Sequence, residues 1–88
     1  MDEIALYVLT GDGPVLERKV SSVNLPTDFG SVGVLRGHAP MLCSLEPGVL
    51  RCRTEDGVIR LRVGKGIASV EHNELTVLVN AAELLEES

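Results

Sequence analysis

The amino-acid sequence predicts an all-β sandwich or barrel built as one small domain. Gly, Pro, Asn and Asp residues recur about every 8 to 12 residues, and apolar residues alternate with polar ones between them. The composition agrees with this class. The 88-residue chain has one Phe, one Tyr and no Trp, so Val, Leu and Ile must fill its interior, and these side chains suit a pleated sheet.

The first half of the chain is typical of strands separated by short turns. Residues 3–10 form the first expected strand, with Ile4, Leu6 and Val8 on one face. The extended run 15–25 changes phase around Ser21 and Ser22, which predicts a β-bulge there. Turns are expected at 11–14, 26–30 and 46–48, and short strands at 31–35 and 41–45, the last with Met41, Cys43 and Leu45 on one side.

The second half predicts two hairpins. Residues 49–55 and 58–63 flank Asp56-Gly57, a pair suited to a type I′ turn. Residues 67–71 and 74–79 form the last hairpin, across His72-Asn73. The first hairpin's register opposes Arg53 to Arg60 and Arg51 to Arg62 on one face, and turns Leu50, Cys52, Ile59, Leu61 and Val63 toward the core.

The C-terminal residues predict a short helical tail. Asn80 is a suitable N-cap, and Glu83 stands three residues later, where its side chain can reach back to the cap. A helix of about two turns is marginal by itself, so it must dock on the sandwich or begin a second domain. We therefore expect a β-sandwich domain at 1–80 and, at 81–88, the start of a truncated or absent helical domain.

Charge and hydropathy exclude several classes of function. The net charge of −5 and the two aromatic residues disfavour nucleic-acid binding, which needs a basic face and stacking side chains. No apolar run approaches the roughly 20 residues of a membrane span. The N-terminus is acidic, whereas a signal peptide begins with basic residues. This difference indicates a reducing compartment. Cys43 and Cys52 are then expected to be buried free thiols, with a disulfide or a redox pair as the alternative.

The sequence offers little to support catalysis. His38, in the stretch LRGHAPML, could be a base, a metal ligand or a loop residue, and His72 lies in a different turn. No HExxH, CxxC or GxSxG motif accompanies them, and Gly64-Lys65-Gly66 lacks the rest of a phosphate-binding loop. Asp28 and Ser31 near His38 make only a weak triad. We therefore expect no catalytic residue, no metal and no cofactor.

Four arginines share one face of the predicted hairpin at 49–63. Arg51, Arg53, Arg60 and Arg62 are half of the eight basic residues. Directly opposed like charges are mildly destabilising in a sheet. The favoured interpretation is a solvated face balanced by nearby glutamates, with the aliphatic stems covering apolar surface. The other interpretation is a docking face for an acidic partner.

A longer stretch resembles a known family. Residues 25–51 read LPTDFGSVGVLRGHAPMLCSLEPGVLR, and 74–79 read ELTVLV. The first stretch resembles the signature of the epsilon subunit of the F-type ATP synthase, which is called delta in mitochondria, and the second resembles a strand near the end of the same domain. The Gly-His-Ala-Pro block is the most specific part, and the resemblance covers almost the whole chain.

The resemblance implies a flattened sandwich of about ten short strands and a non-catalytic central-stalk subunit. Such a subunit binds the gamma subunit and the rotor c-ring and helps couple proton translocation to ATP synthesis. It lies peripherally on the cytoplasmic face of an energy-transducing membrane, here most naturally a bacterial cell membrane, without direct insertion. The partner-contact residues expected from it are Asp28, Ser31, Arg36, Gly37, His38, Pro40 and Met41.

The residue types of this loop suit a rigid contact surface. Pro40 fixes its own φ angle and biases Ala39 toward extended geometry, and Gly37 permits a backbone conformation that a side chain would hinder. His38 then either touches a partner or hydrogen-bonds within the loop. We expect at least one face of the molecule to be too apolar for a monomer, because a standard interface buries about 800 Å² per partner.

The chain also departs from the family pattern. Ser31 stands where a second acidic residue that faces the rotor ring is common, Lys65 replaces a usual glycine, and Asn80 replaces a common aspartate. The helical hairpin of the family is missing, so its inhibitory and ATP-sensing roles are not carried over. The alternative functions are a small-ligand-binding β-barrel with His38 in the wall of a deep pocket, and a self-associating module.

Overall fold

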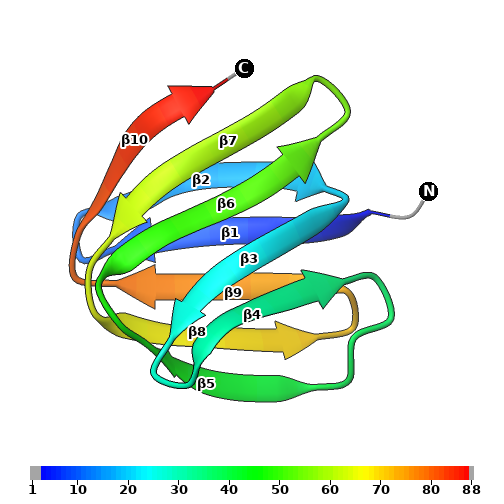
Figure 1. Ribbon diagram of the computed structural model, residues 1–88, viewed down its shortest axis with the longest axis horizontal. Coiled ribbons are helices and arrows are strands. Elements are labelled where there is room, and N and C mark those ends of the chain that lie inside the picture. Colours follow the sequence, from blue (N-terminus) through cyan, green and yellow to red (C-terminus); the bar gives the residue numbers. More distant parts are fainter. Residues whose placement is uncertain (1–2, 88) are drawn as a thin grey trace.

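The computed structural model describes residues 3–87 and confirms the all-β class (Figure 1). Ten strands form one hydrogen-bonded sheet in the order β10-β7-β6-β3-β5-β8-β9-β1-β2, with β4 paired to β3. Neighbouring strands are antiparallel except β1 and β9, which run parallel. The strands are β1 (Ile4–Thr10), β2 (Gly13–Val20), β3 (Ser22–Thr27), β4 (Gly30–Leu35), β5 (Met41–Leu45), β6 (Gly48–Thr54), β7 (Gly57–Val63), β8 (Gly66–Glu71), β9 (Glu74–Val79) and β10 (Ala82–Glu87).

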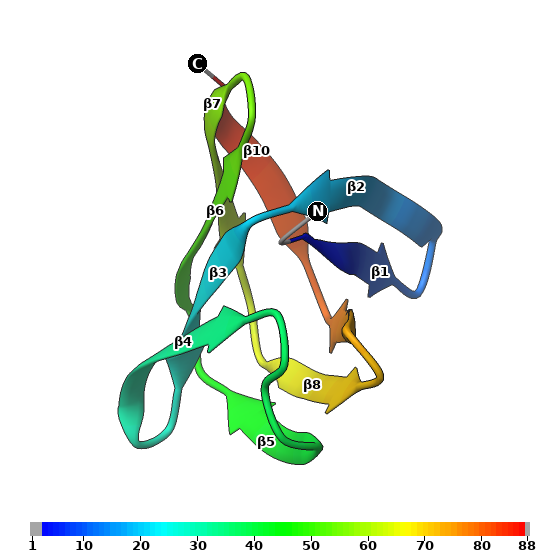
Figure 2. The ribbon, with the colours of Figure 1, turned by 90° about the vertical axis from the view of Figure 1, so that its right-hand side faces the viewer.

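The sheet folds over itself because the chain passes from one layer to the other at the same corner three times. β5 leads into β6, β7 into β8 and β9 into β10, and all three connections lie together at the left in Figure 1. β10, β7, β6, β3 and β4 form one layer, and β5, β8, β9, β1 and β2 form the other (Figure 2). Backbone hydrogen bonds close the corner, from Gly64 N to Ala81 O and from Asn80 N to Lys65 O.

Glycines make this close packing at the corner possible. A Cβ atom on Gly64 would lie within van der Waals overlap of the Asn80 side chain, and one on Gly66 would overlap the backbone of Leu78. A Cβ atom on Gly48 would come within 2.9 Å of the Pro26 Cβ atom. Larger residues at these positions would push the strands apart.

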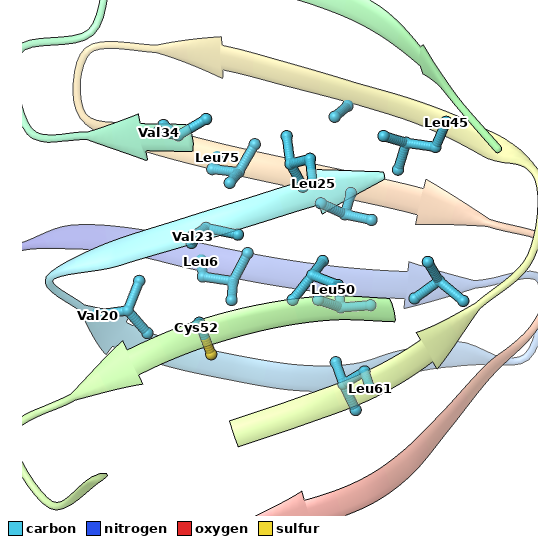
Figure 3. Close-up of a cluster of buried hydrophobic side chains, with 14 of the residues drawn as sticks. Leu6, Val20, Val23, Leu25, Val34, Leu45, Leu50, Cys52, Leu61 and Leu75 are labelled. Atoms are coloured by element: carbon cyan, nitrogen blue, oxygen red, sulfur yellow. The ribbon is translucent and has the colours of Figure 1, made fainter. Parts of the chain in front are cut away.

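Aliphatic side chains fill the space between the layers. Figure 3 shows Leu6, Leu25, Leu50 and Leu75 meeting there from four different strands. Neither aromatic residue belongs to this core: Tyr7 is half-buried on the outer face of β1, and the Phe29 side chain is 92% exposed. The predicted core face of β1 is confirmed, as is the inward side of β5, where Leu45 is buried and Met41 and Cys43 pack against the core.

The prediction of one bulged strand at 15–25 is wrong. β2 ends at Val20 and pairs with β1, whereas β3 begins at Ser22 and pairs with β4 and β6 in the other layer. The phase change around Ser21 therefore marks a change of layer. The irregularity in this region lies between Val8 and Leu9, where the register of β1 against β2 shifts.

Two details of the hairpins also differ from the prediction. Arg51 lies opposite Arg60, and Arg53 lies opposite Val58, so the predicted register is shifted. The turn that joins β6 to β7 has positive φ only at Gly57 (143°), so it is not type I′. The β8–β9 turn has the type I′ sign pattern, with φ angles of 52° at His72 and 61° at Asn73.

The predicted helical tail is wrong, because residues 82–87 form β10. Glu83 lies opposite Arg62 and Glu86 lies opposite Arg60, and both pairs make ion pairs. Pairing with β7 outweighs the local capping signal of Asn80, because the helix that Asn80 would cap has only about two turns and is marginally stable. That the helical domain of the family is truncated or absent in this chain stays a prediction.

Candidate functional site

The β4–β5 loop, residues 36–40, is held by its own backbone and by two other segments. Gly37 has a φ angle of 84°, which glycine adopts freely. Its N–H donates to Asn73 Oδ1 in the β8–β9 turn at 2.7 Å, and Arg36 Nη1 donates to the Glu3 carbonyl oxygen at 3.4 Å. The loop is therefore attached both to the β8–β9 turn and to the residue that precedes β1.

His38 is hydrogen-bonded within this loop. Its N–H donates to the Leu35 carbonyl oxygen at 3.0 Å, and its Nδ1 atom lies 2.7 Å from the Ala39 carbonyl oxygen. Because a carbonyl oxygen only accepts, the imidazole donates through Nδ1. The half-buried ring stabilises the loop and leaves Nε2 as its second polar atom. Of the two roles expected for His38, contact with a partner and hydrogen bonding within the loop, this arrangement agrees with the second.

The predicted contact residues fall into two groups at the two ends of β4. Asp28 and Ser31 belong to the β3–β4 turn and its edge, and both are exposed. The other group follows β4 and comprises Arg36, Gly37, His38, Pro40 and Met41. Both groups lie at the lower end of the molecule in Figures 1 and 2, with β4 and β5 between them. We name residues 28–42, which comprise the β3–β4 turn, β4, the β4–β5 loop and the start of β5, the β4–β5 end.

Met41 is a support residue for the β4–β5 end, whereas its neighbour Leu42 is the exposed one. Met41 is half-buried against the core, and the Leu42 side chain is 73% exposed. The alternation along β5 requires this, since Met41 and Leu42 point to opposite faces. Of these two residues, Leu42 offers the larger surface to a partner.

Three exposed apolar residues at the β4–β5 end were not predicted from the sequence. Besides Leu42, these are Phe29 at the tip of the β3–β4 turn and Leu35 at the end of β4, which is 59% exposed. The Phe29 N–H donates to Thr27 Oγ1 at 3.1 Å, and the Thr27 hydroxyl donates to the Gly30 carbonyl oxygen at 2.6 Å. The turn therefore presents Phe29 at a fixed position. The signal in the sequence was the only Phe of the chain, placed in a turn.

A second apolar surface crosses the outer face of the layer formed by β5, β8, β9, β1 and β2. Ile67 on β8 lies opposite Leu78 on β9, and Leu78 lies beside Leu9 on β1. Ile67 is 47% exposed and Leu78 is 46% exposed. We name these three residues the outer row. The expectation of a face too apolar for a monomer is consistent with the outer row and the β4–β5 end together.

The four arginines of the predicted docking face share the outer surface of β6 and β7. Arg60 Nη1 lies 3.0 Å from Glu86 Oε1, and Arg62 Nη1 lies 3.1 Å from Glu83 Oε1. These ion pairs follow the interpretation in which nearby glutamates balance the face. Arg51 and Arg53 are exposed, and within residues 3–87 neither has an ion-pair partner.

Metal-binding clusters and surface hollows are the other places where the described residues could hold a ligand. Residues 3–87 contain no group of three or more His, Cys, Asp and Glu residues that could hold a metal ion. A hollow of about 460 Å³ lies at the corner between β6, β7 and β10, away from the β4–β5 loop. Its wall includes Pro47, Val49 and Ala82. Among the same residues, no helix is long and apolar enough to cross a membrane.

Both cysteines are free, as expected, and Cys52 is buried while Cys43 is half-buried. Burial raises the pKa of the Cys52 thiol above its ordinary value of 9.0, and it also raises the pKa of Cys43, with a smaller contribution from the Asp28 carboxylate. Raised pKa values keep both groups as thiols, so neither is an activated nucleophile.

Comparison with known proteins identifies the family of this fold. Residues 3–85 match the family described as the ATP synthase delta/epsilon chain, beta-sandwich domain. The ATP synthase epsilon chain of Prochloron didemni is 43% identical over 92% of this chain and 60% of its own length. The epsilon chain of Synechococcus elongatus is 44% identical over 91% of this chain and 58% of its own length. The chain thus spans about three fifths of the length of these relatives.

Solved structures show the same fold. A chain of the Euglena gracilis mitochondrial ATP synthase, from a structure described as OSCP/F1/c-ring, superposes with a TM-score of 0.90 and 27% identity over all of this chain and 57% of its own length. A chain of the Tetrahymena thermophila central stalk and c-ring structure gives a TM-score of 0.76 at 18% identity, over 89% of this chain and 63% of its own length, and supports the fold alone.

These matches confirm the resemblance found in residues 25–51 and the ten-stranded sandwich. The chain belongs to the family of beta-sandwich domains of ATP synthase delta/epsilon chains.

Proposed function

We propose that this chain acts in the central stalk of an F-type ATP synthase, without catalysis of its own. It binds the gamma subunit and the rotor c-ring and helps couple proton translocation to ATP synthesis. The observation that carries the proposal is the family match over residues 3–85. The likeness to a chain from the Euglena gracilis complex, which includes a c-ring, supports it.

The surfaces of the sandwich suggest which part meets which partner. The resemblance implies that the position of Ser31 faces the rotor ring, so we assign the ring contact to the β4–β5 end, with Phe29 and Leu42. The outer row of Leu9, Ile67 and Leu78 is the proposed gamma contact. Both surfaces present apolar side chains that the core of the domain does not use.

The size of the domain is compatible with two partners. A standard interface buries about 800 Å² per partner. The whole surface of the domain is 5222 Å², so two such interfaces would cover less than a third of it. The surface of the domain is therefore large enough for two contact regions.

The rigidity of the β4–β5 loop suits a part that transmits torque. The hydrogen bond between Gly37 and Asn73, together with those that His38 makes within the loop, fixes the loop before a partner arrives. A surface fixed in advance loses little conformational entropy on binding. Through the complex the chain would lie at the periphery of the energy-transducing membrane, on the cytoplasmic face in a bacterium.

Co-purification with each partner tests this proposal. The chain is co-expressed with the gamma subunit or mixed with detergent-solubilised c-ring, and the bound fraction is compared for the wild type, Phe29→Ser/Leu42→Ser and His38→Ala. We expect binding of the wild type to both partners and loss of c-ring binding in the double variant. Val49→Ser is the matched control, because Val49 is a partly exposed apolar residue outside both surfaces.

The proposal is contradicted if the wild type binds neither partner while a full-length epsilon chain binds both. The assignment of surfaces is contradicted if Val49→Ser weakens c-ring binding as much as Phe29→Ser/Leu42→Ser does. His38→Ala removes the ring contact with the Ala39 carbonyl oxygen, so a smaller loss is expected from loosening of the loop.

A further inference from the structure

The outer face of β6 and β7 carries an excess of positive charge on an otherwise acidic chain. Arg51, Arg53, Arg60 and Arg62 point outward here, and Glu83 and Glu86 of β10 face two of them. Four positive charges against two negative ones leave an excess of two, while the whole chain carries −5. We name these four residues the arginine face.

The neutralisation of the arginine face is uneven. Arg60 and Arg62 are paired with Glu86 and Glu83, at the β10 side. Toward β3, Arg51 lies opposite Asn24 and Arg53 lies opposite Ser22, and both of these neighbours are uncharged. The two arginines of β6 are therefore the ones without a carboxylate partner among the described residues.

The surface around these arginines is hollowed. A depression of about 330 Å³ is lined by Arg51, Arg53, Val58, Arg60 and Glu86. Val58 is the apolar residue of this lining, beside three arginines and one glutamate. Such a site suits a carboxylate whose methylene stem packs on Val58, because arginine binds carboxylates in a planar, two-pronged geometry.

We propose that the arginine face docks an acidic segment of a partner protein, laid in extended form along β6. Arg51 and Arg53 are two residues apart on one strand, so their side chains emerge about 6.5 to 7 Å apart. An extended segment with acidic residues at alternate positions places its carboxylates at the same spacing. Glu86 competes for Arg60 from within the chain, so it weakens this docking.

This inference goes beyond the proposed stalk function and does not depend on it. The arginine face belongs to the layer of β6, β7 and β10, whereas the outer row belongs to the layer of β8, β9 and β1. The β4–β5 end lies at the bottom of the molecule in Figure 1, and the arginine hairpin lies in the upper part. Failure of one proposal therefore leaves the other intact.

A defined peptide tests the arginine face. The probe is a fluorescein-labelled hexapeptide with glutamate at positions 1, 3 and 5 and serine between them, and its binding to the whole chain is followed by fluorescence anisotropy at low and physiological salt. We expect Arg51→Gln or Arg53→Gln to weaken binding about tenfold, since each removes one charge-assisted contact. Arg62→Gln should weaken it less than threefold, and Lys65→Gln, the matched control away from the hollow, should not change it.

Further variants and competitors distinguish an acidic segment from a free anion or a second copy of the chain. Glu86→Gln should tighten binding a few fold, because it frees Arg60 without touching the fold of β6. The proposal is overturned if the peptide with glutamine in place of glutamate binds equally well, or if Lys65→Gln weakens binding as much as Arg51→Gln. It is also overturned if pyrophosphate displaces the peptide at equimolar concentration, or if sedimentation shows that the arginine face is occupied by a second copy of the chain.

Discussion

The side-chain oxygen of Asn73 accepts a 2.7 Å hydrogen bond from the backbone N–H of Gly37, and so joins the β8–β9 turn to the β4–β5 loop. Both residues sit in backbone conformations with positive φ, 61° for Asn73 and 84° for Gly37. Asparagine tolerates this region better than most residues, and it supplies the acceptor as well. One contact thus fixes the loop that carries His38 and Pro40.

Loss of the Asn73 side chain should loosen the β4–β5 loop without unfolding the sandwich. Asn73→Gly keeps the backbone conformation but removes the acceptor, whereas Asn73→Asp keeps both. A hydrogen bond of this kind contributes about 1 kcal/mol, so amide exchange at Gly37 should rise about fivefold in Asn73→Gly and stay near the wild-type rate in Asn73→Asp. Equal exchange rates in wild type and Asn73→Gly would show that other contacts hold the loop.

A side chain at Gly66 should destabilise the sandwich strongly. Gly66 pairs with both Leu45 and Val79, and an added Cβ atom would overlap the Leu78 carbonyl oxygen. Gly66→Ala should therefore lower the free energy of unfolding by about 1 to 3 kcal/mol, as measured by urea titration. Gly11→Ala is the control, because its Cβ atom would meet open space. Similar losses in both variants would argue against close packing at this corner.

The ion pairs of β10 should contribute little stability, and salt should remove their contribution. Glu83 and Glu86 pair with β7, and Glu87 pairs with Arg18 of β2 at 3.1 Å. Exposed pairs contribute about 0.2 to 1 kcal/mol each. We expect the triple variant Glu83→Gln/Glu86→Gln/Glu87→Gln to lose roughly 1 to 2 kcal/mol at low salt and much less at 1 M NaCl. A loss that is independent of salt would mean that packing holds β10.

The buried thiol of Cys52 should make the domain less stable at high pH. Burial, the largest effect, raises the pKa of this thiol in the folded state above its ordinary value of 9.0. The stabilisation is therefore complete below pH 9 and is lost as the pH rises through the raised pKa. Between pH 8 and pH 11 the wild type should lose more unfolding free energy than Cys52→Val, which cannot ionise. Parallel pH profiles for the two proteins would contradict this prediction.

The sequence predicted most strands because alternation and turn residues are local signals. The limits of β5 and β9 were predicted as the structure has them. The three hairpin turns beginning at Thr10, Thr27 and Thr54 carry a further local signal. Each has glycine three residues after the threonine, and each threonine hydroxyl accepts the N–H of the residue two positions later. This repeated signal locates the Phe29 tip.

What the sequence could not predict depends on contacts between distant segments. Residues 82–87 have the composition of a helix start, but the edge of β7 and its arginines select a strand. The change of layer at Ser21 likewise follows from the pairing of β3 with β6, which local alternation does not encode. Exposure of Leu42, in contrast, follows from alternation alone once the inward side of β5 is assigned.

Photo-crosslinking from position 42 tests the docking of the β4–β5 end most directly. A photoreactive phenylalanine derivative replaces Leu42, and the chain is irradiated in an assembled complex with gamma and the c-ring. A second sample carries the same group at Val49, outside both proposed surfaces. We predict a crosslink to the c-ring from position 42 and none from position 49. A crosslink only from position 49, or none from position 42 in an assembled complex, would contradict the docking of this end of the sandwich against the rotor.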